Sequence, residues 1–170
     1  METTTTQTEP MQKAEPQEEH QWLQKLVGDW TLEAETASPG ETPVKTTGTE
    51  TVRSIGGLWI VAEGEGEMPG GGTGTSVMSL GYDPQKKRYV GTWIGSMMAQ
   101  LWVYDNGSLD ADQKVLTLES EGPSMSGNGT AKYRDAIELK SDDHRVLTSR
   151  MQGEDGSWQL FMTAHYRRKK

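Results

Sequence analysis

The feature that most constrains the fold is the stretch from Gly81 to Gly107, GYDPQKKRYVGTWIGSMMAQLWVYDNG. Residues 89–95 and 99–104 are rich in aromatic and β-branched side chains, which is typical of strands. Tyr82-Asp83-Pro84 predicts a turn before them, because proline restricts φ and Asp accepts a local backbone hydrogen bond. Asp105-Asn106-Gly107 predicts a second turn after them. We therefore expect two antiparallel strands joined by a Met-rich link.

The rest of the chain repeats this pattern of short strands and tight turns. Trp30, Leu32 and Ala34 alternate with polar residues, as in a strand with one buried face. A series of such strands is typical of an up-and-down meander, which closes into a barrel because closure removes exposed edges. We predict an all-β, lipocalin-like antiparallel β-barrel of about ten strands. The expected strands cover 29–36, 44–55, 58–67, 75–82, 89–95, 99–104, 115–121, 130–139, 145–151 and 158–167.

Two segments precede the expected barrel. Residues 1–18 are mainly Thr, Gln, Glu and Pro and are predicted to be a disordered tail, because they contain too little apolar surface to form a core. Residues 19–27 predict a short helix, which Gly28 ends. Its apolar stripe consists of Trp22, Leu23, Leu26 and Val27. Such a short helix needs a docking partner, and we expect it to cover one end of a barrel domain spanning 19–170.

Composition excludes several classes of function. The chain has no cysteine and a net charge of −8, so thiolate sites are excluded and nucleic acid is not an expected partner. The basic run 167–170 is interpreted as a solvated end. The first ten residues, METTTTQTEP, do not resemble a secretory signal, and no apolar run approaches the roughly 20 residues that span a bilayer. We expect a cytoplasmic protein without a membrane partner; the sequence does not indicate its oligomeric state.

A specific resemblance supports the barrel. Gly28-Asp29-Trp30, after a short helix and at the start of the first strand, resembles the lipocalins and their calycin relatives, which include the fatty-acid-binding proteins. The segments GYDPQKKRYVGTW, LW, SEGP, YRD and DDHR resemble an uncharacterised bacterial family, a domain of unknown function with a lipocalin-like barrel. The resemblance covers about 19–168 and implies the fold rather than an activity. It also implies that Trp30 packs at the closed end beneath Arg168, with Arg167 as the alternative.

The interior of such a barrel can hold a small ligand. We predict non-catalytic binding of a small, largely apolar molecule; the alternative is an interaction module with a filled core. Trp and Met side chains give an adaptable apolar lining. The candidate lining residues are Trp30, Trp59, Trp93, Met97, Met98, Trp102, Tyr133 and Met162, with Glu50 and Arg168 as polar candidates. Glu50 faces inward if its strand is regular, whereas a bulge at Gly48 would turn it to solvent.

Haem binding, or haem-dependent chemistry, through His165 is a further alternative, because a haem-binding branch of the small barrels uses a histidine on a late strand. The alternation of that strand predicts instead that His165 faces outward, unless a bulge reverses it. No catalytic motif is evident: Arg134 and Asp135 are adjacent and face opposite sides of a strand. The turn Asp142-Asp143-His144 is interpreted as a polar turn rather than a metal site. We predict no cofactor.

Overall fold

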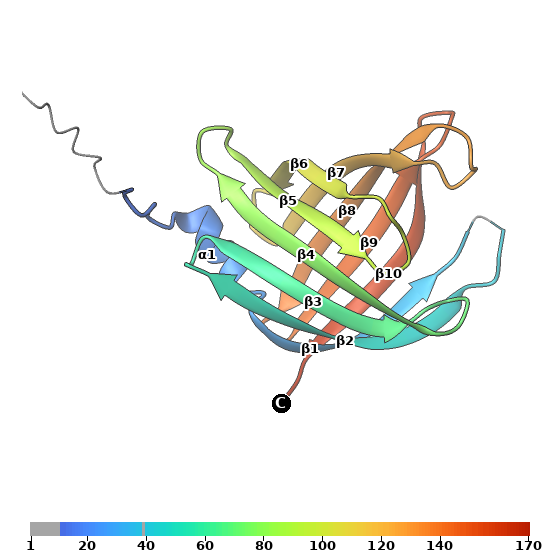
Figure 1. Ribbon diagram of the computed structural model, residues 1–170, viewed down its shortest axis with the longest axis horizontal. Helices are drawn as coiled ribbons and strands as arrows, with labels where there is room; N and C mark the ends of the chain where they lie inside the picture. The colour runs from blue at the N-terminus through green and yellow to red at the C-terminus, as the bar shows by residue number, and fades with distance from the viewer. Residues whose placement is uncertain (1–10, 39) are drawn as a thin grey trace, which may run out of the picture.

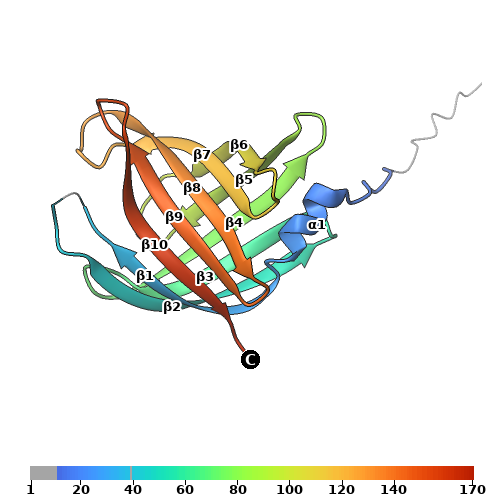
Figure 2. The same cartoon turned by 180° about the vertical axis from the view of Figure 1, so that it is seen from behind.

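Ten antiparallel strands follow one another around a closed barrel, and one short helix precedes them (Figures 1 and 2). This computed structural model describes residues 11–38 and 40–170. Each strand pairs with its neighbours in the chain, and β1 also pairs with β10. The predicted fold class is confirmed. The elements are α1 (Glu18–Gln24), β1 (Gly28–Thr36), β2 (Val44–Ile55), β3 (Trp59–Glu67), β4 (Thr73–Asp83), β5 (Arg88–Gly95), β6 (Trp102–Leu109), β7 (Val115–Pro123), β8 (Thr130–Ser141), β9 (His144–Gln152) and β10 (Trp158–Arg168).

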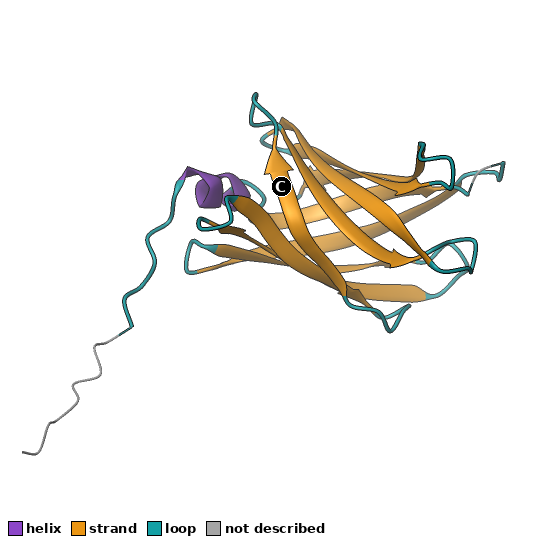
Figure 3. Cartoon of the chain, turned by 90° about the horizontal axis from the view of Figure 1, so that it is seen from above, coloured by secondary structure: helices purple, strands orange, loops and turns teal. Residues whose placement is uncertain are grey.

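The helix α1 covers one end of the barrel, and loops surround the other end (Figure 3). Trp22, Leu23 and Leu26 are buried there. The Trp22 indole donates a hydrogen bond of 2.7 Å to the Gln113 carbonyl in the β6–β7 turn. The Tyr89 hydroxyl donates one of 3.1 Å to the Glu19 carbonyl. The helix is thus held by the sheet, as its short length requires.

The closed end has the arrangement that the resemblance implied. Trp30 is 1% exposed, and its indole donates to the Leu26 carbonyl at 2.9 Å. The Arg168 guanidinium lies 4.3 Å from the Trp30 ring and donates to the carbonyls of Val27 at 2.7 Å and Lys25 at 3.1 Å. Arg168, not Arg167, therefore joins the last strand to the segment that follows α1.

The sixth strand differs from its prediction. The expected turn at Asp105-Asn106-Gly107 is wrong, because β6 continues through it to Leu109. Gly107 pairs with Tyr89 and with Leu118, and a Cβ at this position would lie 2.7 Å from the Tyr89 carbonyl oxygen. This glycine thus permits a close backbone approach rather than a turn.

A bulge in β10 breaks the predicted alternation from Trp158 to Tyr166. The pairing with β9 shifts between Leu160 and Met162. Leu160 is therefore 50% exposed, and the Trp158 ring lies 4.1 Å from the outward guanidinium of Arg134. An inserted residue reverses the faces on its two sides, which is why simple alternation fails here.

The predicted tail is only partly described. Residues 1–10 lie outside the described residues, while residues 11–17 are exposed and belong to no helix or strand. Among the described residues, no helix has the length and apolar character that a membrane span requires.

A candidate ligand pocket inside the barrel

A pocket of about 450 Å³ lies inside the barrel, at the end away from α1. The β5–β6 link and the β7–β8 loop form part of its rim. Four methionines and five aromatic side chains dominate its walls. The lining residues are Met78, Trp93, Met98, Gln100, Trp102, Tyr104, Ser120, Pro123, Met125, Tyr133, Asp135, Leu147, Ser149, Phe161 and Met162.

One polar cluster lies in the wall of this apolar pocket. The Tyr104 hydroxyl of β6 donates a 2.7 Å hydrogen bond to Oδ2 of Asp135 on β8. Ser149 of β9 pairs with Asp135 across the sheet and also hydrogen-bonds to its carboxylate. Burial raises the pKa of Asp135, and the hydrogen bonds from Ser149 and Tyr104 oppose this shift. Burial, and then the Asp135 charge, raises the pKa of Tyr104.

The raised pKa of Asp135 predicts a pH-dependent stability. Because the folded state holds the proton more tightly than the unfolded state, ionisation of Asp135 lowers stability as pH rises through the interval between the two pKa values. Asp135→Asn should therefore raise the free energy of unfolding at about pH 7, and the gain should shrink as pH falls. Urea unfolding over a pH series measures this, with Asp105→Asn on the exposed face as control. A variant less stable than the native chain at every pH would contradict the prediction.

A buried ion pair lies below the pocket, toward the closed end. Glu50 of β2 faces inward, as the regular register predicted, and forms a salt bridge with Nη2 of Arg145 on β9. Their side chains are 12% and 5% exposed, respectively. The Arg145 guanidinium lies 3.9 Å from the ring of Tyr166 and 4.7 Å from that of Trp30. Interior cation–π contacts and the carboxylate together offset part of the cost of burying this charge.

A small cavity of about 50 Å³ adjoins the ion pair. Glu50, Arg145 and Tyr166 contribute to its wall. Arg145 Nε has no hydrogen-bond partner among the described residues. A cavity of this size is large enough to hold a water molecule. Met78, Trp93 and Leu147 line both this cavity and the larger pocket, so they form the partition between them.

Five of the predicted lining residues meet in the pocket: Trp93, Met98, Trp102, Tyr133 and Met162. They come from β5, the β5–β6 link, β6, β8 and β10. The Trp102 indole lies edge-on to the Tyr133 ring, with 4.9 Å between ring centroids, and donates to Met98 Sδ at 2.9 Å. The structure brings these side chains together; ligand binding by them stays a prediction.

The other predicted lining residues lie elsewhere. Trp59 is wrong as a lining residue: it is 41% exposed and points outward, because Ile60 takes the inward position. Met97 is also wrong, since it is 41% exposed and does not reach the pocket wall. Trp30 and Arg168 belong to the closed end, and Glu50 lies one layer below the pocket.

Sequence reasoning missed Arg145, Tyr104, Ser149 and Phe161. The inward position of Arg145 could have been predicted from the sequence. It lies at alternate positions with Leu147 and Ser149, and an inward Glu50 requires a cationic partner. Phe161 reaches the pocket only because of the β10 bulge. The sequence itself does not encode that bulge in any pattern we recognise.

His165 faces outward, as the alternation predicted. Its side chain is exposed, and Nδ1 lies 3.0 Å from Nε2 of His144 on the outer surface. A haem inside the barrel therefore could not use His165 as its iron ligand. Within the described residues, no three His, Asp or Glu side chains are grouped closely enough to hold a metal ion.

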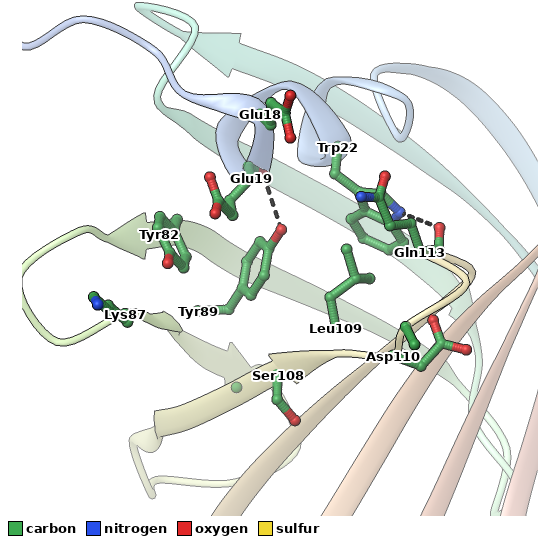
Figure 4. A pocket seen from close by; sticks show the side chains of 12 residues that line it. Glu18, Glu19, Trp22, Tyr82, Lys87, Tyr89, Ser108, Leu109, Asp110 and Gln113 are labelled. Atoms are coloured by element: carbon green, nitrogen blue, oxygen red, sulfur yellow. Dashed lines mark hydrogen bonds between the residues drawn. The ribbon is translucent and has the colours of Figure 1, made fainter.

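A second hollow, of about 400 Å³, lies outside the barrel between α1 and strands β4 to β6 (Figure 4). Glu18, Glu19, Lys87 and Asp110 lie around it, so its rim is charged. Tyr89, one of its three aromatic residues, already hydrogen-bonds to the helix, as the dashed line between Tyr89 and Glu19 in Figure 4 shows. The hollow is thus the seam where α1 docks, and the interior pocket is the better candidate for an apolar ligand.

The fold is that of a calycin-like barrel, a small closed antiparallel barrel. Residues 15–168 match the family described as "Protein of unknown function (DUF1579)", and the chain belongs to that family. No curated protein matches the chain.

Two solved structures share this fold at low sequence identity. Rv2717c from M. tuberculosis is 14% identical with a TM-score of 0.60, and the match covers 92% of this chain and 100% of that one. The S-type phycobiliprotein lyase CPES from Guillardia theta is 14% identical with a TM-score of 0.58, over 91% and 99% of the two chains. At this identity the likeness establishes the fold alone.

Proposed function

We propose that this protein binds a small, largely apolar molecule in the interior pocket without transforming it. The supporting observation is the pocket of about 450 Å³ with a lining of methionine and aromatic side chains. Ligand sites typically have volumes of about 300–1,000 Å³ and combine apolar walls with a few polar groups. Tyr104, Asp135 and Ser149 supply such a polar group here.

The packing of the barrel favours the ligand-binding hypothesis over the alternative of a filled core. The half next to α1 is filled by large buried side chains such as Trp30, Leu80 and Leu116. In the other half, Met98 and Met125 remain 40% and 49% exposed at the pocket rim. Flexible methionines at an open pocket adapt to ligands of different shape.

An apolar, environment-sensitive dye tests the proposal. We expect it to bind with one-site stoichiometry, with a rise in dye fluorescence and quenching of tryptophan emission from Trp93 and Trp102. Ser120→Phe adds bulk inside the pocket and should weaken binding by about tenfold or more, which corresponds to about 1.4 kcal/mol. The control is Thr49→Phe, which adds a ring to the exposed outer face of β2.

Three results separate the outcomes. Selective loss of dye binding in Ser120→Phe, with an unchanged unfolding midpoint, supports an open pocket. Equal binding in both variants would place the dye outside the barrel. A native protein that binds no apolar probe and is strongly destabilised by Ser120→Phe would favour the filled core, because overpacking costs about 1–3 kcal/mol.

A further inference from the structure

The described lining of the pocket contains an acidic side chain and no basic one. Among the described residues that line it, Asp135 is the only ionisable acid or base besides the two tyrosines. The neighbouring basic residue Arg134 faces outward and binds Glu119 at 3.0 Å. Arg145, the buried arginine of the interior, is already engaged by Glu50. The walls therefore offer a carboxylate and no cation to a bound ligand.

The Asp135 carboxylate also has unused accepting capacity. An ionised carboxylate accepts about four hydrogen bonds, and Tyr104 and Ser149 provide two. A ligand that donates a hydrogen bond would extend this cluster. An anionic ligand would instead bring a second negative charge into an apolar site without a partner, which is strongly unfavourable.

The aromatic walls of the pocket also favour a positively charged ligand. The rings of Trp102 and Tyr133 lie edge to face at 4.9 Å, and those of Tyr133 and Phe161 at 6.1 Å. The faces of such rings attract cations, and Trp does so most strongly. The Asp135 carboxylate and these aromatic rings therefore both favour a ligand with a positively charged group.

Building on the proposed function, we propose that the ligand is a small aromatic or apolar molecule with one basic nitrogen. The nitrogen binds at Asp135, and the apolar body packs among the aromatic rings and methionines. The pocket correspondingly discriminates against carboxylates of the same size.

Three nearly isosteric probes test this selectivity: 1-naphthylmethylamine, 1-naphthylmethanol and 1-naphthoate, titrated by calorimetry at about pH 8, where the amine is charged. We expect the amine to bind at least about tenfold more tightly than the alcohol, and the naphthoate to bind most weakly. Asp135→Asn should remove the advantage of the amine and weaken the binding of the alcohol much less, because the Asn carbonyl oxygen can still accept a hydrogen bond. The control Glu65→Gln removes an equal charge from the exposed outer face and should change nothing.

The alcohol separates the two proposals. If none of the three probes binds, the proposed function itself fails. If the alcohol binds but the naphthoate binds as well as or better than the amine, the pocket exists and the inference is overturned. An equally large loss of alcohol and amine binding in Asp135→Asn would also overturn the inference. Asp135 would then maintain the shape of the pocket rather than recognise the charge of the ligand. The order of affinities in the native protein decides the matter even if Asp135→Asn does not fold.

Discussion

Replacing Glu50 by Gln is expected to lower the free energy of unfolding by about 3–5 kcal/mol. The substitution keeps the shape of the side chain but leaves the Arg145 guanidinium buried without its counter-charge. The rings of Trp30 and Tyr166 hold this guanidinium in place, so it cannot turn out to solvent without opening the closed end of the barrel. Urea unfolding measures the loss.

Two further variants identify the cause. Glu63→Gln removes the carboxylate of an exposed pair with Arg53, in which both side chains are 57% exposed, and should cost less than about 1 kcal/mol. The double variant Glu50→Gln/Arg145→Met should recover most of the stability, because an apolar replacement removes the unpaired charge. A loss from Glu50→Gln no larger than that from Glu63→Gln would show that the interior pair is effectively solvated.

Trp30→Ala should destabilise the barrel by a similar amount, about 3–5 kcal/mol, because it leaves a large cavity at the closed end. It also removes the ring on which both Arg145 and Arg168 rest and the hydrogen bond to Leu26. Trp59→Ala is the matched control: it deletes an indole from the outer surface and should cost less than about 1 kcal/mol. Similar losses in the two variants would contradict the central role of Trp30.

Local alternation and turn chemistry predict most of this fold. Trp30, Leu32 and Ala34 alternate with polar residues, and β1 follows that pattern. The prediction fails where backbone geometry departs from the two-residue repeat. Gly107 has the signature of a turn yet lies inside β6, because its missing side chain admits the Tyr89 backbone. The bulge before Met162 has no sequence signature of comparable strength.

The candidate site was harder to predict than the fold, because its polar residues come from three strands. Tyr104, Asp135 and Ser149 meet only through the register of β6, β8 and β9 around the closed barrel. From the sequence, Asp135 could be considered as a pair only with its neighbour Arg134, which faces the opposite side of the strand. Apolar residues such as Trp93 and Trp102 were predictable, since their strands are adjacent and the two residues pair directly across the sheet.

Methionine methyl groups report most directly on the central claim that the interior pocket binds a small apolar molecule. The chain has nine methionines, and four of them, Met78, Met98, Met125 and Met162, line the pocket. In a ¹³C-methyl NMR titration with 1-naphthylmethanol, we expect saturable shifts of these four signals with a single dissociation constant. The signal of Met11, which is 98% exposed, should not move, and that of Met97 should move much less than that of its neighbour Met98. Unchanged signals from the four pocket methionines, or shifts largest at Met11 and Met97, would contradict binding inside the barrel.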